Sequence, residues 1–182
     1  MSVRLLRATD RIAAPWRNGG GVTQEIAASP AGATFGDFDW RVSIATVSAG
    51  GPFSQFPGID RILTVLDGVL ELSIGNDPTF RLTSEMPPFA FSGDADCDGS
   101  PVGGPVTDLN VMLRRGFCSA TVTRVSAFGF KPPGTCLFVA LAAANASAED
   151  TKWGLEQHDA LIAENDAVEW RGTGICIVIK AR

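Results

Sequence analysis

"DRILTVLDGVLELSIG", residues 60–75, contains two short β-rich runs on either side of Asp67-Gly68. An Asp-Gly pair between two such runs is a strong signal for a two-residue β-hairpin turn. We therefore expect residues 60–66 and 69–74 to form an antiparallel hairpin. Because side chains alternate along a strand, Arg61 shares a face of the first strand with Leu63 and Val65.

Runs of the same kind recur along the chain, whereas helical periodicity is nearly absent. Gly, Pro, Asp and Asn separate the runs, and many short strands at this spacing indicate a sandwich or a barrel. We therefore predict an all-β fold. The stretch 93–107, "GDADCDGSPVGGPVT", is expected to be an ordered long loop without regular structure. The further predicted strands cover residues 22–28, 39–47, 108–115, 119–125, 135–143 and 173–181.

Composition and charge exclude several classes of partner. The chain has 182 residues, of which 45% are hydrophobic and 19% charged, as in a globular protein with one large domain or two small lobes. A net charge of -5 argues against a nucleic-acid partner. The longest apolar run, 137–144, is too short to span a bilayer, and no apolar core follows the basic start. We therefore expect no membrane partner and a cytoplasmic location.

The counts of cysteine and histidine limit the chemistry. The four cysteines lie far apart with no C-x-x-C pair, and we interpret them as free thiols. His158 is the only histidine, which excludes the usual metal site of two or three histidines, so we expect no metal and no other cofactor. The sequence contains no G-x-S-x-G or S-x-x-K motif and no cysteine beside a histidine. No catalytic residues are therefore assigned, and whether the protein is an enzyme stays open.

Three polar residues on predicted strands are candidates for a binding site. Arg41 shares a strand face with Ser43 and Ala45, and Asn110 lies on the face of its strand that also carries Asp108 and Met112. If Arg41, Arg61 and Asn110 point into a small barrel, cations lie among apolar walls, where an unpaired charge costs several kcal/mol. A carboxylate ligand would remove that cost, because the arginine fork makes two parallel hydrogen bonds to it.

The alternative is that the arginines of these strands lie outside the barrel. They would then pair with surface carboxylates such as Asp60 or Glu71. Strand parity alone does not decide between the two arrangements, because it does not say which face is buried.

A second candidate region is "PWRNGGGVTQEI", residues 15–26, where three glycines precede a predicted strand. We expect a sharply bent entry into the first barrel strand, which brings Trp16, Arg17 and Asn18 to the mouth of the barrel. An anion-binding backbone nest is the alternative. Phe53 and Phe56 in "GGPFSQFPGIDR" would add apolar pocket walls, although core packing explains them equally well.

Taken in order, six segments of the sequence resemble the HutD/Ves family of small bacterial proteins. The resemblance is dense over residues 4–117 and thinner beyond. It implies a cupin-type β-barrel or sandwich with two cupin modules in one chain (a bicupin), residues 1–115 and 116–182, packed as one compact unit. It also implies an association with histidine catabolism, whose intermediates include formiminoglutamate and formylglutamate. The segments are "RLLRATD", "PWRNGGGVTQEI", "FDWRVSIATV", "GPFSQFPGIDRILTVLDG", "PFAFSGDADCDG" and "PVTDLNVMLRRG".

The resemblance also bears on the site. Metal-binding cupins carry an H-x-H…E pattern ahead of a hairpin glycine, and here phenylalanines stand about where the histidines would, with Arg61 about where the glutamate would. An apolar and cationic site suits a small anionic metabolite. The predicted ligand-binding residues are Trp16, Arg17, Asn18, Arg41, Phe53, Phe56, Arg61 and Asn110.

Three functions remain open at this point. The first is a non-metal cupin that binds a small carboxylate, with formylglutamate or formiminoglutamate as candidates, as a regulatory or accessory protein of histidine utilisation. The second is a metal-independent enzyme, an isomerase or hydrolase acting on a sugar or amino-acid derivative. The third is a subunit-contact role with an inert barrel, and a homodimer would cover the open sheet edges of a mostly-β chain.

Overall fold

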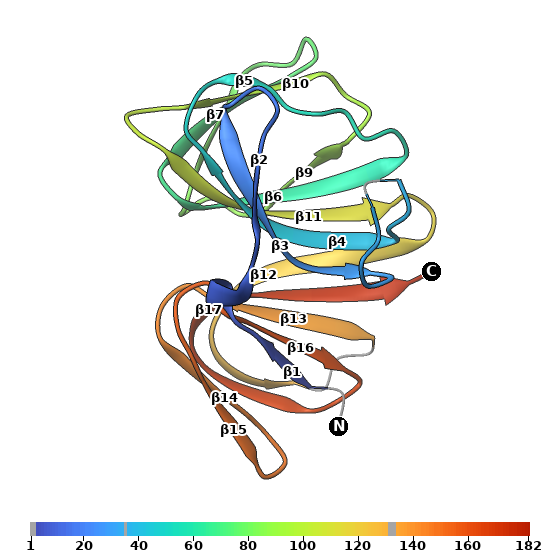
Figure 1. Cartoon of the computed structure of the whole chain (residues 1–182), viewed down its shortest axis with the longest axis vertical. Coiled ribbons are helices and arrows are strands. Elements are labelled where there is room, and N and C mark those ends of the chain that lie inside the picture. The colour runs from blue at the N-terminus through green and yellow to red at the C-terminus, as the bar shows by residue number, and fades with distance from the viewer. Residues whose placement is uncertain (1–2, 35, 131–133) are drawn as a thin grey trace. The chain divides into compact units, whose positions relative to one another are not determined.

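The computed structural model describes residues 3–34, 36–130 and 134–182, and strands dominate throughout (Figure 1). These residues form two units. The central unit is Ile12–Arg115, and the terminal unit combines residues 3–11 with Gly116–Arg182. The predicted all-β class is therefore confirmed, and each predicted strand segment contains a strand.

The central unit consists of two antiparallel sheets that enclose an apolar core. In order, the larger sheet contains β2 (Ala13–Pro15), β3 (Gly21–Ser29), β4 (Trp40–Val47), β11 (Val106–Arg114), β6 (Ile59–Asp67) and β9 (Phe89–Ser92). The smaller sheet contains β5 (Gly51–Pro52), β10 (Cys97–Pro101), β7 (Val69–Ile74) and β8 (Phe80–Thr83). Leu63 and Val65 of the larger sheet and Leu70 and Leu72 of the smaller one belong to the same buried cluster.

The predicted hairpin around Asp67-Gly68 is wrong. β6 pairs with β9 and β11, whereas β7 pairs with β8 and β10. Gly68 has a φ of 84°, and a Cβ there would lie 2.8 Å from the carbonyl oxygen of Pro105. The turn therefore carries the chain from one sheet to the other, because both strands bury their apolar faces in the shared core.

The prediction of an irregular loop over residues 93–107 is also wrong in part. Cys97–Pro101 forms β10, which pairs with β7 from Cys97↔Ile74 to Pro101↔Leu70. Gly99 in this strand faces the ring of Phe53, and a Cβ at this position would collide with that ring. The glycine content of the stretch therefore reflects close packing against an aromatic side chain as well as turns.

The terminal unit is one sheet, in which the long strand β17 pairs along most of its length with β12. Phe138 and Trp170 stack in its core with ring centroids 5.7 Å apart. The strands in order are β1 (Arg4–Leu6), β16 (Ala160–Glu164), β13 (Thr135–Ala140), β17 (Val168–Ala181), β14 (Ala144–Ala148) and β15 (Thr151–Leu155), with β12 (Cys118–Phe130) beside β17.

The first residues of the chain belong to the terminal unit. β1 pairs with β16, and Asp159 accepts hydrogen bonds from the Arg7 guanidinium and from the Ala8 backbone N–H, both at 2.7 Å. The short 3-10 helix η1 (Ala8–Asp10) follows. Residues 3–11 thus group with Gly116–Arg182, and the expected division into two cupin modules, residues 1–115 and 116–182, stays a prediction. Residues 1–2 lie outside the described residues.

Two further expectations concern cysteines and membranes. Cys97, Cys118, Cys136 and Cys176 are free thiols, as interpreted from their spacing. None of the helices in the described ranges has the length and apolar character needed to cross a bilayer.

Candidate ligand-binding site

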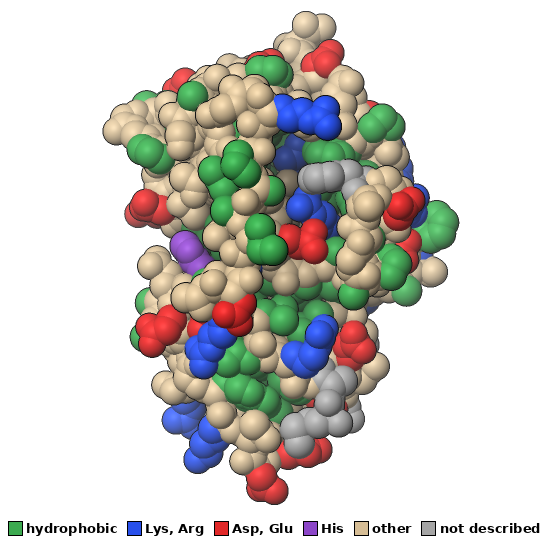
Figure 2. Space-filling model, viewed as in Figure 1, with side chains coloured by type: hydrophobic (Ala, Val, Ile, Leu, Met, Phe, Trp, Pro, Cys, Tyr) green, Lys and Arg blue, Asp and Glu red, His purple; other side chains and the backbone are tan. Residues whose placement is uncertain are grey.

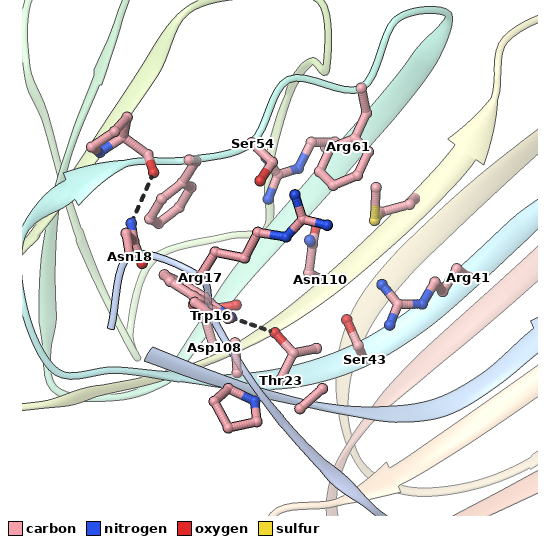
Figure 3. A pocket seen from close by; sticks show the side chains of 17 residues that line it. Trp16, Arg17, Asn18, Thr23, Arg41, Ser43, Ser54, Arg61, Asp108 and Asn110 are labelled. Carbon is pink, nitrogen blue, oxygen red and sulfur yellow. Dashed lines mark hydrogen bonds between the residues drawn. The ribbon is translucent and has the colours of Figure 1, made fainter. Parts of the chain in front are cut away.

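The central unit contains a cavity of about 700 Å³ (Figure 3). Its floor is formed by strands of the larger sheet, and its rim by the segments 16–18 and 52–56. On the face shown in Figure 2, Arg or Lys side chains are visible inside a hollow flanked by apolar side chains. All eight residues predicted to bind a ligand line this cavity, and their role in binding stays a prediction.

Strand alternation determines which side chains reach the cavity. On β4, Arg41, Ser43 and Ala45 line it, and on β11 the residues that do so include Asp108 and Asn110. The residues between them face the other side of the sheet. The sequence grouped these side chains correctly by face, and the structure adds that the face with the arginines points inward.

The segment Trp16–Gly20 closes a hairpin between β2 and β3, and the three glycines at positions 19–21 differ in their surroundings. Gly19 has a φ of 71°, which favours glycine, and a Cβ on Gly20 would lie 3.3 Å from the side-chain oxygen of Asn18, which accepts the Gly20 N–H at 3.0 Å. A Cβ on Gly21 would lie 2.6 Å from the carbonyl oxygen of Thr46 and 3.1 Å from the Trp16 ring. The glycines thus let the Trp16 indole lie against the backbone, where its Nε1–H donates to Thr23 at 2.7 Å.

Arg61 is the most unusual group in the cavity. Its residue is only 6% exposed, and three aromatic rings surround its guanidinium carbon, at 5.7 Å for Phe53, 5.6 Å for Phe56 and 4.9 Å for Phe91. Within the described chain, its buried Nε has no hydrogen-bond acceptor. Burial lowers the pKa of Arg61, and the nearby Asp108 opposes that shift. The group nevertheless stays charged, because arginine does not lose its proton in proteins.

The arrangement in which these arginines lie outside is therefore wrong. Asp60 pairs with Arg115 at 2.8 Å, and Glu71 pairs with Arg81 at 2.9 Å. Arg61 forms no salt bridge with any described carboxylate and instead faces the cavity.

The other two arginines differ from Arg61 in their surroundings. Arg41 is buried, but its Nε donates to Glu25 at 2.7 Å, so a carboxylate already neutralises it. Arg17 is exposed at the rim, and Figure 3 shows its side chain reaching over the cavity toward Arg61 and Asn110. A ligand in the cavity would therefore contact Arg61 inside it and Arg17 at its rim.

Asp108 is a site residue that the sequence prediction left out. Among the described residues that line the cavity, it carries the only carboxyl group. It is 3% exposed, and burial raises its pKa to about 7 although Arg61 acts in the opposite direction. Its position two residues before Asn110 on the same strand face was the signal that could have identified it.

The cavity residues do not fit a metal ion. Among the described side chains that line it, none is an imidazole or a thiol, and three are arginines. Across the described ranges, no group of three His, Cys, Asp or Glu side chains could hold a metal ion. A single carboxylate beside several guanidinium groups is a poor donor set for the divalent metals that proteins bind.

The fold and the cavity define a cupin-like β protein with an internal polar site. The HutD family model matches residues 8–178, and the chain belongs to this family. The resemblance noted in the sequence is thus confirmed.

Relatives agree with this assignment. The chain is 39% identical over 108 residues to Protein Ves of Citrobacter koseri, which covers 59% of the chain and 56% of the relative. It is 40% identical over 111 residues to an uncharacterised 21.2 kDa protein in the hutC 3' region of Pseudomonas putida, covering 60% and 57% respectively. The matched part thus spans little more than half the length of these curated relatives.

Solved structures match over nearly the whole chain. HutD from Pseudomonas fluorescens SBW25, solved in a formate condition, is 29% identical with a TM-score of 0.85 and 99% coverage of both chains. A conserved protein of unknown function from Pseudomonas aeruginosa PAO1 is also 29% identical, with a TM-score of 0.87, and covers 100% of this chain and 99% of its own. A cupin 2 conserved barrel domain protein from Leptotrichia buccalis, 8% identical with a TM-score of 0.63 and 89% coverage of both chains, shows the fold alone.

Proposed function

We propose that this HutD-family protein binds a small organic carboxylate in the cavity of its central unit. The observation that carries the proposal is the buried guanidinium of Arg61, which lies among aromatic rings and forms no salt bridge with a carboxylate of the described residues. Aromatic faces offset part of the cost of burying a cation, yet they accept none of its hydrogen bonds. A ligand carboxylate supplies both the charge and the acceptors.

The cavity suits a metabolite of modest size. A volume of about 700 Å³ lies within the range typical of small-molecule sites, about 300–1,000 Å³. Arg17 at the rim offers a second cation, so that a dicarboxylate can bind through both ends. Formylglutamate and formiminoglutamate are dicarboxylates, and the family's link to histidine utilisation makes them the first candidates.

The proposal extends to the architecture and to the kind of activity. Each unit would be one cupin module, and the central module would act without a metal as an accessory or regulatory binding site. The C-terminal module has no assigned ligand.

One observation favours the alternative of a metal-independent enzyme. Asp108 is a buried carboxyl group with a pKa of about 7, which is a property of general acids and bases. Incubation of metal-stripped protein with formylglutamate and formiminoglutamate decides between the two functions. Turnover that disappears in Asp108→Asn would favour the enzyme, and unchanged ligand recovered from saturated protein would favour the binder.

Isothermal titration calorimetry with these two compounds tests the binding proposal. We expect at least one of them to bind with a Kd below about 1 mM, which corresponds to roughly 4 kcal/mol. Arg61→Met should weaken binding about 10- to 100-fold, since hydrogen bonds to charged groups contribute about 1.5–3 kcal/mol.

The matched control is Arg81→Met, which removes the same charge from an exposed arginine of the central unit that pairs with Glu71. It should leave the Kd unchanged. Equal losses in both variants, or no binding by either compound, would contradict the proposal.

A further inference from the structure

The cavity contains an acceptor for which the proposed carboxylate has no use. Asp108 is 3% exposed, and none of the described residues donates a hydrogen bond to its carboxyl group or forms a salt bridge with it. Buried acceptors are almost always bonded to a donor, and leaving one without costs about 1–3 kcal/mol. A ligand carboxylate does not satisfy the ionised form of Asp108, because it offers only acceptors and adds a like charge.

The strands beside Asp108 explain why the protein supplies no donor. In the register of the larger sheet, Asp108 is opposite Ala45 of β4 and Val65 of β6, and neither side chain carries a polar atom. Thr23 also lines the cavity, and its hydroxyl accepts the Trp16 Nε1–H at 2.7 Å but forms no hydrogen bond with Asp108 in the described structure.

The same register separates this acceptor from the arginines. Met112 is opposite Arg41 on one side and Arg61 on the other, four residues along β11 from Asp108. Four residues of extended strand span about 13 Å between Cα atoms. Arg41 and Arg61 therefore leave the backbone at the Met112 end of the floor and Asp108 leaves it at the other end, although the Arg61 guanidinium still interacts electrostatically with the Asp108 carboxyl group.

Asn110 lies between the two ends, opposite Ser43 and Leu63. Its side-chain oxygen is buried and has no donor in the described part of the chain. Besides the arginines, the floor therefore offers two polar groups in a row, Asp108 and Asn110, to which no described residue donates a hydrogen bond.

We propose that Asp108 accepts a hydrogen bond from the ligand, so that the cavity selects carboxylates carrying an N–H donor over simple carboxylates. N-acyl and N-formimino amino acids belong to this class, whereas formate, acetate and glutarate do not. This inference rests on the proposed function, because it requires a carboxylate to be bound by the arginines first.

The competing role for Asp108 is that of a structural counter-ion, which acts on Arg61 through space. The two roles predict opposite effects of removing the carboxyl group. A counter-ion lowers the affinity for every anion, so its removal strengthens the binding of all carboxylates alike. A hydrogen-bond acceptor distinguishes between ligands, so its removal abolishes that distinction.

The test compares two ligands that differ by one atom. N-formyl-L-glutamate carries an amide N–H, and its freshly prepared ester analogue, 2-(formyloxy)glutarate, has an oxygen in that place. Calorimetry at pH 8, above the pKa of Asp108 of about 7, gives the ratio of the two Kd values for each protein. We expect the wild type to prefer the amide roughly 10- to 100-fold, the range for a hydrogen bond to a charged group.

Asp108→Leu should reduce this preference to within about twofold, because it leaves no acceptor. Asp77→Asn, which removes a carboxylate from an exposed turn of the same unit, should preserve it. Circular dichroism confirms that each variant is folded. If the leucine variant is not folded, Asp108→Val, which also leaves no hydrogen-bond acceptor, takes its place.

The outcomes separate the two proposals. Equal Kd values for both ligands in the wild type, with binding still lost in Arg61→Met, would overturn this inference and leave the carboxylate site standing. An amide preference that survives in the folded Asp108 variant would overturn it as well. Binding of neither ligand would overturn both proposals.

Discussion

The two units of the chain are built from the same kind of antiparallel sheet, yet their interiors differ. In the terminal unit, Phe138 and Trp170 are at most 1% exposed and stack in a core of apolar side chains. In the central unit, Arg41, Arg61 and Asp108 are buried around a cavity of about 700 Å³. The comparison shows that the candidate site depends on which residues occupy the inward strand positions and that the fold class alone does not create it.

One strand from each unit illustrates this difference. On β13 the side chains buried in the core cluster are Cys136, Phe138 and Ala140, all apolar. On β4 the side chains that line the cavity include Arg41 and Ser43. The first pattern contributes to stability through burial of apolar area, whereas the second places polar side chains in the interior, where their burial costs free energy unless they are hydrogen-bonded.

The largest expected change in the free energy of unfolding comes from a substitution in the apolar core of the terminal unit. Phe138→Ala should lower the free energy of unfolding by about 3–5 kcal/mol, because it deletes a fully buried ring and leaves a cavity beside Trp170. Urea denaturation measures this change. Phe117→Ala, at a position that is 60% exposed, is the control and should change it by less than about 1 kcal/mol. A loss below about 1 kcal/mol for Phe138→Ala would mean that this core is loosely packed.

Asp108 should make the stability of the ligand-free central unit depend on pH. Its pKa of about 7 in the folded state lies above the ordinary value of 3.8, so the neutral form is favoured by folding. The contribution of Asp108 is therefore fully present below about pH 4 and is lost as the pH rises through 7. The total loss is of the order of 4 kcal/mol.

Urea denaturation of the wild type and of Asp108→Asn between pH 4 and pH 8 measures this effect. The difference between their free energies of unfolding should change by that amount across the range. The other charged groups among the described residues that line the cavity are Arg17, Arg41 and Arg61. Parallel curves for the two proteins would show that Asp108 is solvated and ionised throughout.

The smallest expected change in the free energy of unfolding is that of Arg61→Met, a substitution that should weaken ligand binding without weakening the fold. At pH 6, where Asp108 is mostly neutral, Arg61→Met should leave the free energy of unfolding unchanged or raise it by about 1 kcal/mol. The reason is that methionine fills a similar volume and removes a buried charge that has no salt bridge among the described residues. A destabilisation of more than about 3 kcal/mol, the effect of breaking a complete buried ion pair, would show that Arg61 already has its partner within the protein.

Local patterns in the sequence predicted the strands and the grouping of side chains by face, because both depend on alternation within one strand. The pairing of strands was not predictable in this way. Asp67-Gly68 has the signature of a hairpin, but the choice of partner for β6 and β7 depends on the core that Leu63 and Leu70 share across the two sheets. The glycine at position 99 suggested a loop, whereas it admits the ring of Phe53.

The sequence predicted which residues line the candidate site better than it predicted their ion pairs and charges. The eight residues lie at inward strand positions, beside the glycine turn or in the rim segment 52–56, which the sequence marked by its phenylalanines ahead of Arg61. The pairing of Arg41 with Glu25 was not foreseen, because it joins neighbouring strands across a register shift between Glu25 and Ala27. Asp108 was overlooked because a single aspartate on a strand carries no motif.

A crystal structure of the protein grown with N-formyl-L-glutamate tests the central claim most directly, because it locates the carboxylate relative to Arg61. The account predicts electron density in the cavity with carboxylate oxygens about 3 Å from the guanidinium nitrogens of Arg61. The claim would be contradicted by a ligand bound elsewhere, or by an Arg61 guanidinium paired with a carboxylate of the protein while the cavity holds only solvent.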